Sequence, residues 1–121
     1  MRKRESFILT YHSLDTSGSV ISTHPDSFNL QMELLASSQR KVVPLSEINR
    51  SPGSIAITFD DGFRNFLDHG LPVLKRYRLP ATVFVVTCYC GAHNRWPSQP
   101  RRGIPKLELM SWDELNQTVR S

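Results

Sequence analysis

Two adjacent carboxylates, Asp60 and Asp61, are the residues of this sequence best suited to chemistry. They follow the apolar run 55–59, whose length and β-branched content predict a buried strand. In parallel α/β sheets, ligands and catalytic groups gather beyond the carboxyl ends of such strands. One carboxylate can bind a cation there while its neighbour accepts a proton from metal-bound water, which is the chemistry of metal-assisted hydrolysis. The alternative is a tight turn, because Asp-Gly is a common turn dipeptide and Gly62 lets the backbone turn sharply.

The four histidines are the next candidates for catalytic or metal-binding roles. His12 ends a predicted strand, so it is a candidate for lining the same site as the carboxylates. The other three are expected on the surface: His24, His69 and His93.

A C-x-C-x-x-H pattern follows the last predicted strand, with Cys88, Cys90 and His93 in its three positions. We interpret it as a strand end with two small buried thiols and a loop histidine rather than as a metal site. A disulfide between thiols so close in sequence would be strained, so reduced cysteines are expected. Trp112 is expected to pack from a helix, whereas Trp96, in a loop, is a candidate for lining the site.

An alternation of strands and helices must position these residues. The hydrophobic pattern predicts strands over 6–11, 41–43, 55–59 and 81–86 and helices over 25–38, 63–77 and 112–120. Loops or turns are predicted over 14–23, 50–53 and 91–103, and one helical turn over 46–49. Gly70 and Pro72 predict a kink or break in the second helix. Ser111 and Glu114 have the spacing of a capping box at the start of the third.

This alternation is typical of a parallel α/β sheet. A chain of 121 residues with 39% apolar content can form a modest core, so we predict one domain over residues 1–121. A closed barrel of parallel strands and helices takes about 200 residues or more, so this length corresponds to about half of one.

The net charge of +4 favours acidic partners only weakly, because the basic residues are scattered. Only Arg2-Lys3-Arg4 and Arg101-Arg102 cluster, and no nucleic-acid motif accompanies them, so we expect a solvated basic surface and no nucleic-acid partner. No stretch approaches the roughly 20 apolar residues of a membrane span. Residues 6–10 are too short for the apolar part of a signal peptide, so the compartment is unknown and the cytoplasm is the default expectation.

Residues 58–62, with the sequence TFDDG, resemble the first signature of the NodB-like polysaccharide deacetylases, carbohydrate esterase family four. Other segments resemble that family in the same order along the chain. They are Tyr11-His12, residues 25–35 and 42–45, Asn65 with 71–75, residues 79–85 and residues 110–115. The resemblance therefore extends over nearly the whole chain.

The resemblance implies a distorted (β/α) barrel, here its N-terminal part, that removes N- or O-acetyl groups from an acetylated polysaccharide. With such a substrate, Trp96 is a candidate for stacking on a sugar ring. It also implies that Asp60 is the catalytic base and that Asp61 is a ligand of a divalent metal, zinc in the complete domain. The family's second signature carries two metal-binding histidines spaced i and i+4, and this sequence has no such pair. One aspartate cannot hold zinc in a catalytic site with three protein ligands, so the metal is expected only in the complete domain.

Our sequence-based hypothesis is a portion of a metal-dependent polysaccharide deacetylase that is inactive or nearly inactive alone. The alternative is a non-catalytic carbohydrate-binding or assembly module. Half a barrel leaves an open sheet edge and uncovered apolar helix faces, through which it could pair with another chain or with a second copy of itself. A third hypothesis is a decayed reading frame without a role.

Overall fold

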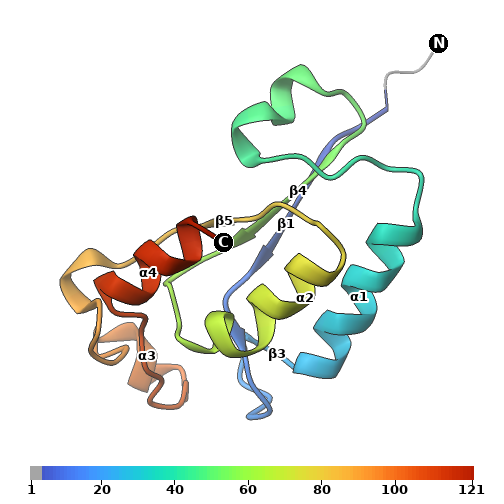
Figure 1. Ribbon diagram of the computed structural model, residues 1–121. Helices are drawn as coiled ribbons and strands as arrows, with labels where there is room; N and C mark the ends of the chain where they lie inside the picture. Colours follow the sequence, from blue (N-terminus) through green and yellow to red (C-terminus); the bar gives the residue numbers. More distant parts are fainter. Residues whose placement is uncertain (1–3) are drawn as a thin grey trace.

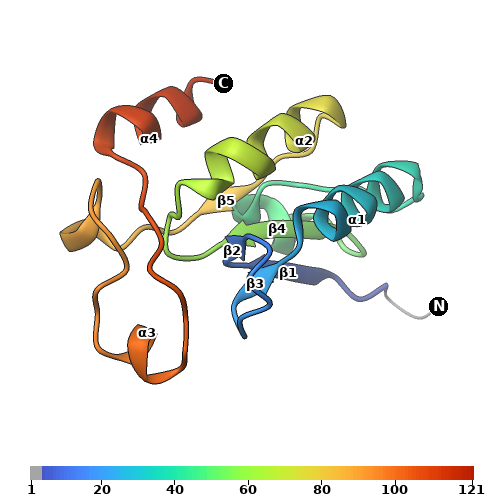
Figure 2. The ribbon, with the colours of Figure 1, turned by 90° about the horizontal axis from the view of Figure 1, so that it is seen from below.

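The structure, a computed structural model, describes residues 4–121 and is built on a parallel sheet (Figure 1). The strands of this sheet lie in the order β1-β4-β5, with β1 at Phe7–Tyr11, β4 at Ile55–Phe59 and β5 at Thr82–Val83. Three helices lie on one side of the sheet: α1 (Pro25–Ser37), α2 (Leu71–Arg76) and α4 (Trp112–Val119). The segment with α3 (Ser98–Arg101) extends toward the other side (Figure 2). This is the partial α/β barrel that the sequence predicts.

Strand β4 is the centre of the fold, because all of its residues are buried. It pairs in register with β1 along its whole length. The Phe59 ring at its end lies among three other rings, with centroid distances of 5.4 Å to Tyr11, 5.6 Å to Phe28 and 4.7 Å to Phe66. Such aromatic pairs add to the stabilisation that comes from burial, so this cluster joins β1, β4, α1 and the segment before α2 into one core.

The segment predicted as a helix over 63–77 is irregular but not interrupted. A turn of π-helix, η2 (Phe66–Gly70), runs directly into α2. Pro72 has no N–H to donate to the preceding turn, so regular α-helical hydrogen bonding does not extend back through it. Packing also requires a small residue at Gly70, because an added Cβ would lie 2.9 Å from Phe66 Cδ2 and 3.2 Å from Leu14 Cδ1.

Two predicted strands are wrong in extent. Residues 41–43 contribute only an isolated parallel bridge between Val42 and Ile55, because the chain leaves the sheet at Pro44 and enters a 3₁₀ helix at Leu45. The strand predicted over 81–86 is reduced to β5, whose residues are half-buried rather than buried. Among the described residues no strand pairs with the outer side of β5, so nothing there covers or prolongs it.

Two predicted loops contain short regular elements. Residues 14–23 include parts of a small parallel pair, β2 (Ser13–Leu14) and β3 (Ser22–Thr23). Residues 91–103 include α3, and the predicted turn at 46–49 is a 3₁₀ helix, η1 (Leu45–Arg50). The capping box of α4 is confirmed, since the Glu114 N–H donates to Ser111 Oγ and the Ser111 N–H donates to Glu114 Oε1. Within residues 4–121, no helix has the length and apolar character needed to cross a membrane.

Candidate functional site

The acidic pair lies where β4 ends, beyond the carboxyl end of the central strand. The Asp60 N–H donates a 2.9 Å hydrogen bond to the Tyr11 carbonyl, which ties Asp60 to the neighbouring strand. Asp61 and Gly62 then both adopt the left-handed backbone conformation, with φ of 77° and 70°. That conformation is costly for a residue with a side chain, and such strained positions cluster at functional sites. We refer to residues 60–62 as the acidic turn.

Glycine is required at the third position of the acidic turn. Besides the positive φ, a Cβ added to Gly62 would lie 3.0 Å from Val85 Cγ1, in the segment after β5. The Gly62 carbonyl also accepts a 2.9 Å hydrogen bond from the Met110 N–H. The acidic turn is therefore fixed between the end of β5 and the segment that leads into α4.

His12 lies beside Asp60, with 3.5 Å between His12 Nε2 and Asp60 Oδ2. The two side chains are 35% and 39% exposed, so both can be reached from solvent. They meet because β1 and β4 are neighbouring parallel strands, and residues that follow such strands emerge at the same edge of the sheet. The structure thus places an imidazole beside the Asp60 carboxylate, at a separation longer than that of a direct hydrogen bond.

Partial burial raises the pKa of the Asp61 carboxyl, and the negative charge of Asp60 adds to this effect while His12 opposes it. The protein therefore disfavours a negative charge on Asp61. A cation bound at Asp61 would act in the opposite direction and stabilise the ionised carboxylate.

The residues present do not make a complete zinc site. Residues 4–121 contain no group of three or more His, Cys, Asp or Glu side chains that could hold a metal ion. His24 and His69 are exposed, as predicted. His93 is half-buried rather than fully exposed, and its backbone forms an antiparallel bridge with Glu108. A catalytic zinc site needs three protein ligands, so Asp61 would require ligands from elsewhere.

Both cysteines are free, as expected, but the prediction that both are buried is wrong. Cys88 is exposed and Cys90 is half-buried. The reason is that the chain leaves the sheet after β5 and forms a short 3₁₀ helix, η3 (Thr87–Tyr89), instead of continuing as a covered strand.

The two tryptophans lie in different parts of the molecule, Trp96 against Phe63 and Trp112 in α4. The Trp96 ring is 6.5 Å from Phe63, nearly parallel to it at 30°, and 5.4 Å from Tyr89. Since Phe63 directly follows Gly62, Trp96 lies close to the acidic turn, and its contact with a sugar stays a prediction. Trp112 is 56% exposed, so the expectation that it packs from its helix is wrong, because nothing described covers that face of α4.

Asn65 links the two segments that carry the candidate site residues, a role that residue patterns alone do not reveal. Its Oδ1 accepts a 3.1 Å hydrogen bond from the Leu14 N–H, and its Nδ2 donates a 2.7 Å bond to Ser13 Oγ. These bonds join the segment after β1 to the segment after β4, which are the two segments that carry His12 and the aspartates. The signal that could have found it is its place in the family resemblance.

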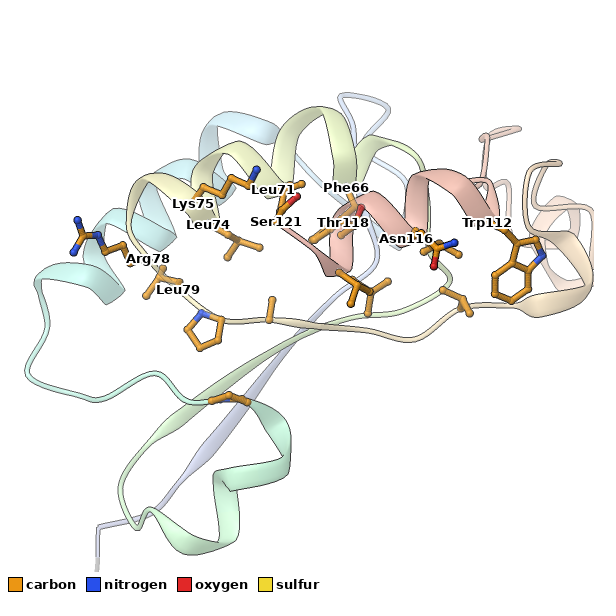
Figure 3. Close-up of a pocket in the computed structure, with 17 residues that line it drawn as sticks. Phe66, Leu71, Leu74, Lys75, Arg78, Leu79, Trp112, Asn116, Thr118 and Ser121 are labelled. Carbon is orange, nitrogen blue, oxygen red and sulfur yellow. The ribbon is translucent and has the colours of Figure 1, made fainter.

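A separate apolar groove of about 760 Å³ lies between α2 and α4, over β5 (Figure 3). Leu71 and Leu74 line it from α2, and Trp112 and Leu115 line it from α4. Neither aspartate of the acidic turn lines the groove, so it is not part of the candidate catalytic site.

The fold and the acidic turn together define a class of protein. These are α/β barrel-type proteins in which an acidic pair follows the central strand, at the carboxyl edge of the sheet. The family model for polysaccharide deacetylases matches residues 47–121, and the chain belongs to that family. It is 31% identical over 107 residues to a poly-beta-1,6-N-acetyl-D-glucosamine N-deacetylase of Staphylococcus aureus, a match that covers 83% of this chain and 34% of that protein.

Solved structures of deacetylases share the fold. IcaB from Ammonifex degensii matches with a TM-score of 0.79 at 22% identity, over 97% of this chain and 49% of that one. The Streptococcus pyogenes deacetylase PplD, in complex with acetate, matches with a TM-score of 0.71 at 18% identity, over 98% of this chain and 54% of that one. The chain thus spans about a third of the curated relative and about half of the two structures.

Proposed function

We propose that this chain is the part of a polysaccharide deacetylase domain that carries the catalytic base, and that the domain hydrolyses N- or O-acetyl groups of a carbohydrate polymer. The observation that carries the proposal is the acidic turn beyond β4, with His12 Nε2 3.5 Å from Asp60 Oδ2. The relative whose name is poly-beta-1,6-N-acetyl-D-glucosamine N-deacetylase supports an acetylated polysaccharide as the substrate class.

Asp60 is the general base in this proposal. Its carboxylate takes a proton from a water molecule that attacks the acetyl carbonyl carbon. The bond from that carbon to the sugar nitrogen or oxygen then breaks, and acetate and the free amine or hydroxyl leave. The proton that Asp60 takes up must then reach the leaving group, and we propose that His12, whose Nε2 lies 3.5 Å from Asp60 Oδ2, assists this transfer.

A divalent metal, zinc in our proposal, would polarise the acetyl carbonyl when bound, and Asp61 is the residue with which this chain would hold it. Because no group of three potential ligands occurs among residues 4–121, we propose that the other ligands come from outside this chain. The 121-residue chain alone should then be inactive or nearly so.

Acetate release from an acetylated glucosamine oligomer tests this proposal. The purified chain with added zinc should release no acetate above the background, and activity should appear when the carboxyl-terminal part of the Staphylococcus aureus relative is added. Asp60→Asn should abolish that activity, whereas the matched variant Asp68→Asn, at an exposed carboxylate of η2, should retain it. Activity of the chain alone would disprove its dependence on outside ligands. Full activity of Asp60→Asn would disprove the role of Asp60.

The groove between α2 and α4 favours a second candidate function, a non-catalytic assembly module that pairs with another chain or with a second copy. Sedimentation velocity over a range of concentrations tests the pairing of copies. A dimer that dissociates in the variant Leu115→Lys would support it, and a monomer at every concentration would contradict it.

A further inference from the structure

Residues 91–106, which we call the α3 lobe, contain no acidic residue and carry the basic residues Arg95, Arg101, Arg102 and Lys106. The charge of these side chains equals the net charge of the whole chain, +4, so the rest of the sequence is electrically balanced. All of them are exposed, and none forms an ion pair with any residue from 4 to 121. The positive charge of the lobe is therefore available to a ligand.

A buried amide network gives the lobe a fixed shape. Asn94 and Gln99 are only 5% and 6% exposed. Asn94 Nδ2 donates to Gln99 Oε1 at 3.0 Å and to the Pro105 carbonyl at 2.9 Å, and Asn94 Oδ1 accepts from the Leu107 N–H at 2.6 Å. These bonds close the two ends of the lobe on each other. Binding to such a preformed surface costs less conformational entropy than binding to a flexible loop.

The lobe adjoins the acidic turn. It lies beyond the carboxyl ends of β1 and β4 in both views of the molecule (Figures 1 and 2). On one side Trp96 packs against Phe63, and on the other the chain returns to the turn through the 2.9 Å bond from the Met110 N–H to the Gly62 carbonyl. A polymer bound at the acidic turn can therefore extend over the lobe.

We propose that the α3 lobe binds the carboxylate groups of an anionic glycan, next to the acidic turn. The choice of a glycan rests on the proposed function. Arginine suits this role because its guanidinium binds a carboxylate through two parallel hydrogen bonds. Without a bound cation the acidic turn repels a polyanion, so a neighbouring cationic surface favours the binding of one. A neutral polymer would gain nothing from these charges.

Nucleic acid is the other common polyanion, and the lobe suits it less well. Binding of single strands relies on several aromatic side chains on which successive bases stack. The lobe has one such ring, Trp96, and that ring is already half-buried against Phe63 and Tyr89.

Fluorescence anisotropy with a labelled oligogalacturonate tests the inference on the 121-residue chain. The labelled acidic oligosaccharide should bind more tightly than a labelled neutral chito-oligosaccharide, and its Kd should rise with salt. Arg101→Gln with Arg102→Gln should raise the Kd roughly tenfold. The matched pair Lys41→Gln with Arg50→Gln removes the same charge from exposed positions near the amino end of β4 and should change the Kd less than about twofold.

Equal affinity for the acidic and the neutral oligosaccharide would overturn the inference. An equal rise in the Kd for the two variant pairs would do the same. So would tighter binding of a single-stranded DNA oligonucleotide that depends on Arg101 and Arg102 in the same way. Circular dichroism of each variant checks that it is folded. The measurement is binding alone, so it is separate from the acetate-release test. If the deacetylase activity is found but oligogalacturonate does not bind, the proposed role of the α3 lobe is refuted and the proposed function is not.

Discussion

The core around Phe59 and the groove between α2 and α4 lie against the same sheet but differ in how closely they are packed. Around Phe59, side chains from β1, α1 and η2 close on β4, and Phe28, Phe59 and Phe66 are at most 3% exposed. Helix α4, in contrast, has no buried residue at all, and its Trp112 and Val119 are 56% and 84% exposed. The half of the molecule around Phe59 is therefore closely packed, and the half that carries the groove is not.

The largest effect should come from Phe59→Ala, which removes the ring at the centre of the packed half. Loss of a buried aromatic side chain costs about 3–5 kcal/mol in the free energy of unfolding, from lost burial and from the cavity left behind. Urea denaturation followed by circular dichroism measures it. The matched control is Phe84→Ala, at a side chain that is 49% exposed just after β5, and it should cost less than about 1 kcal/mol. Equal losses in the two variants would contradict the contrast between the halves.

The next effect concerns the capping box of α4. Because α4 buries no residue, its first turn depends on the bonds between Ser111 and Glu114. Ser111→Ala should lower the free energy of unfolding by about 1 kcal/mol, as is typical for loss of an N-cap. Ser46→Ala, at an exposed position in η1, is the control and should be nearly neutral. A neutral Ser111→Ala would mean that packing, rather than the cap, holds α4.

The same contrast explains which elements the sequence predicts well. Local patterns predict the residues of β4, the irregular helix at Gly70 and Pro72 and the cap at Ser111, and the structure confirms these features. The strand at 81–86 is shorter than predicted, because its length depends on a neighbour that residues 4–121 do not provide. Elements of the packed half are thus predictable from their own residues, and those of the open half depend on what covers them.

The candidate site divides in a similar way. The meeting of His12 and Asp60 follows from the rule that parallel strands deliver their carboxyl ends to one edge. The link that Asn65 makes does not follow from any local pattern. It depends on hydrogen bonds with Ser13 and Leu14, which are far away in the sequence, and the bond from the Met110 N–H to the Gly62 carbonyl is equally long-range. Long-range contacts of this kind are what short sequence motifs leave out.

A smaller effect should come from Asp61→Asn, which tests whether the ionised Asp61 carboxylate lowers the free energy of unfolding. Burial raises the pKa of this carboxyl, so the ionised form is less favourable in the folded chain than in the unfolded chain. Above the folded pKa this cost is fully present, and below the unfolded pKa it vanishes because the carboxyl is neutral in both states. Asp61→Asn should therefore be more stable than the natural chain at pH 7, and the gain should shrink as the pH falls.

Urea denaturation at several pH values measures that difference, with Asp68→Asn as the control, since Asp68 is an exposed carboxylate. The control should show no gain at pH 7. A gain for Asp61→Asn that persists unchanged in acid would assign the effect to the backbone rather than to the charge.

The smallest effect should come from Trp112→Ala in the groove. A large aromatic side chain usually costs several kcal/mol when it is removed, but that cost arises only where the ring is buried. Trp112 is 56% exposed, so its removal should change the free energy of unfolding by about 0.5 kcal/mol or less. If the groove receives a partner, the same variant should weaken that association far more than it affects the isolated chain, because the ring would be buried only in the complex. A loss as large as that of Phe59→Ala in the isolated chain would show instead that α4 is already part of a complete core.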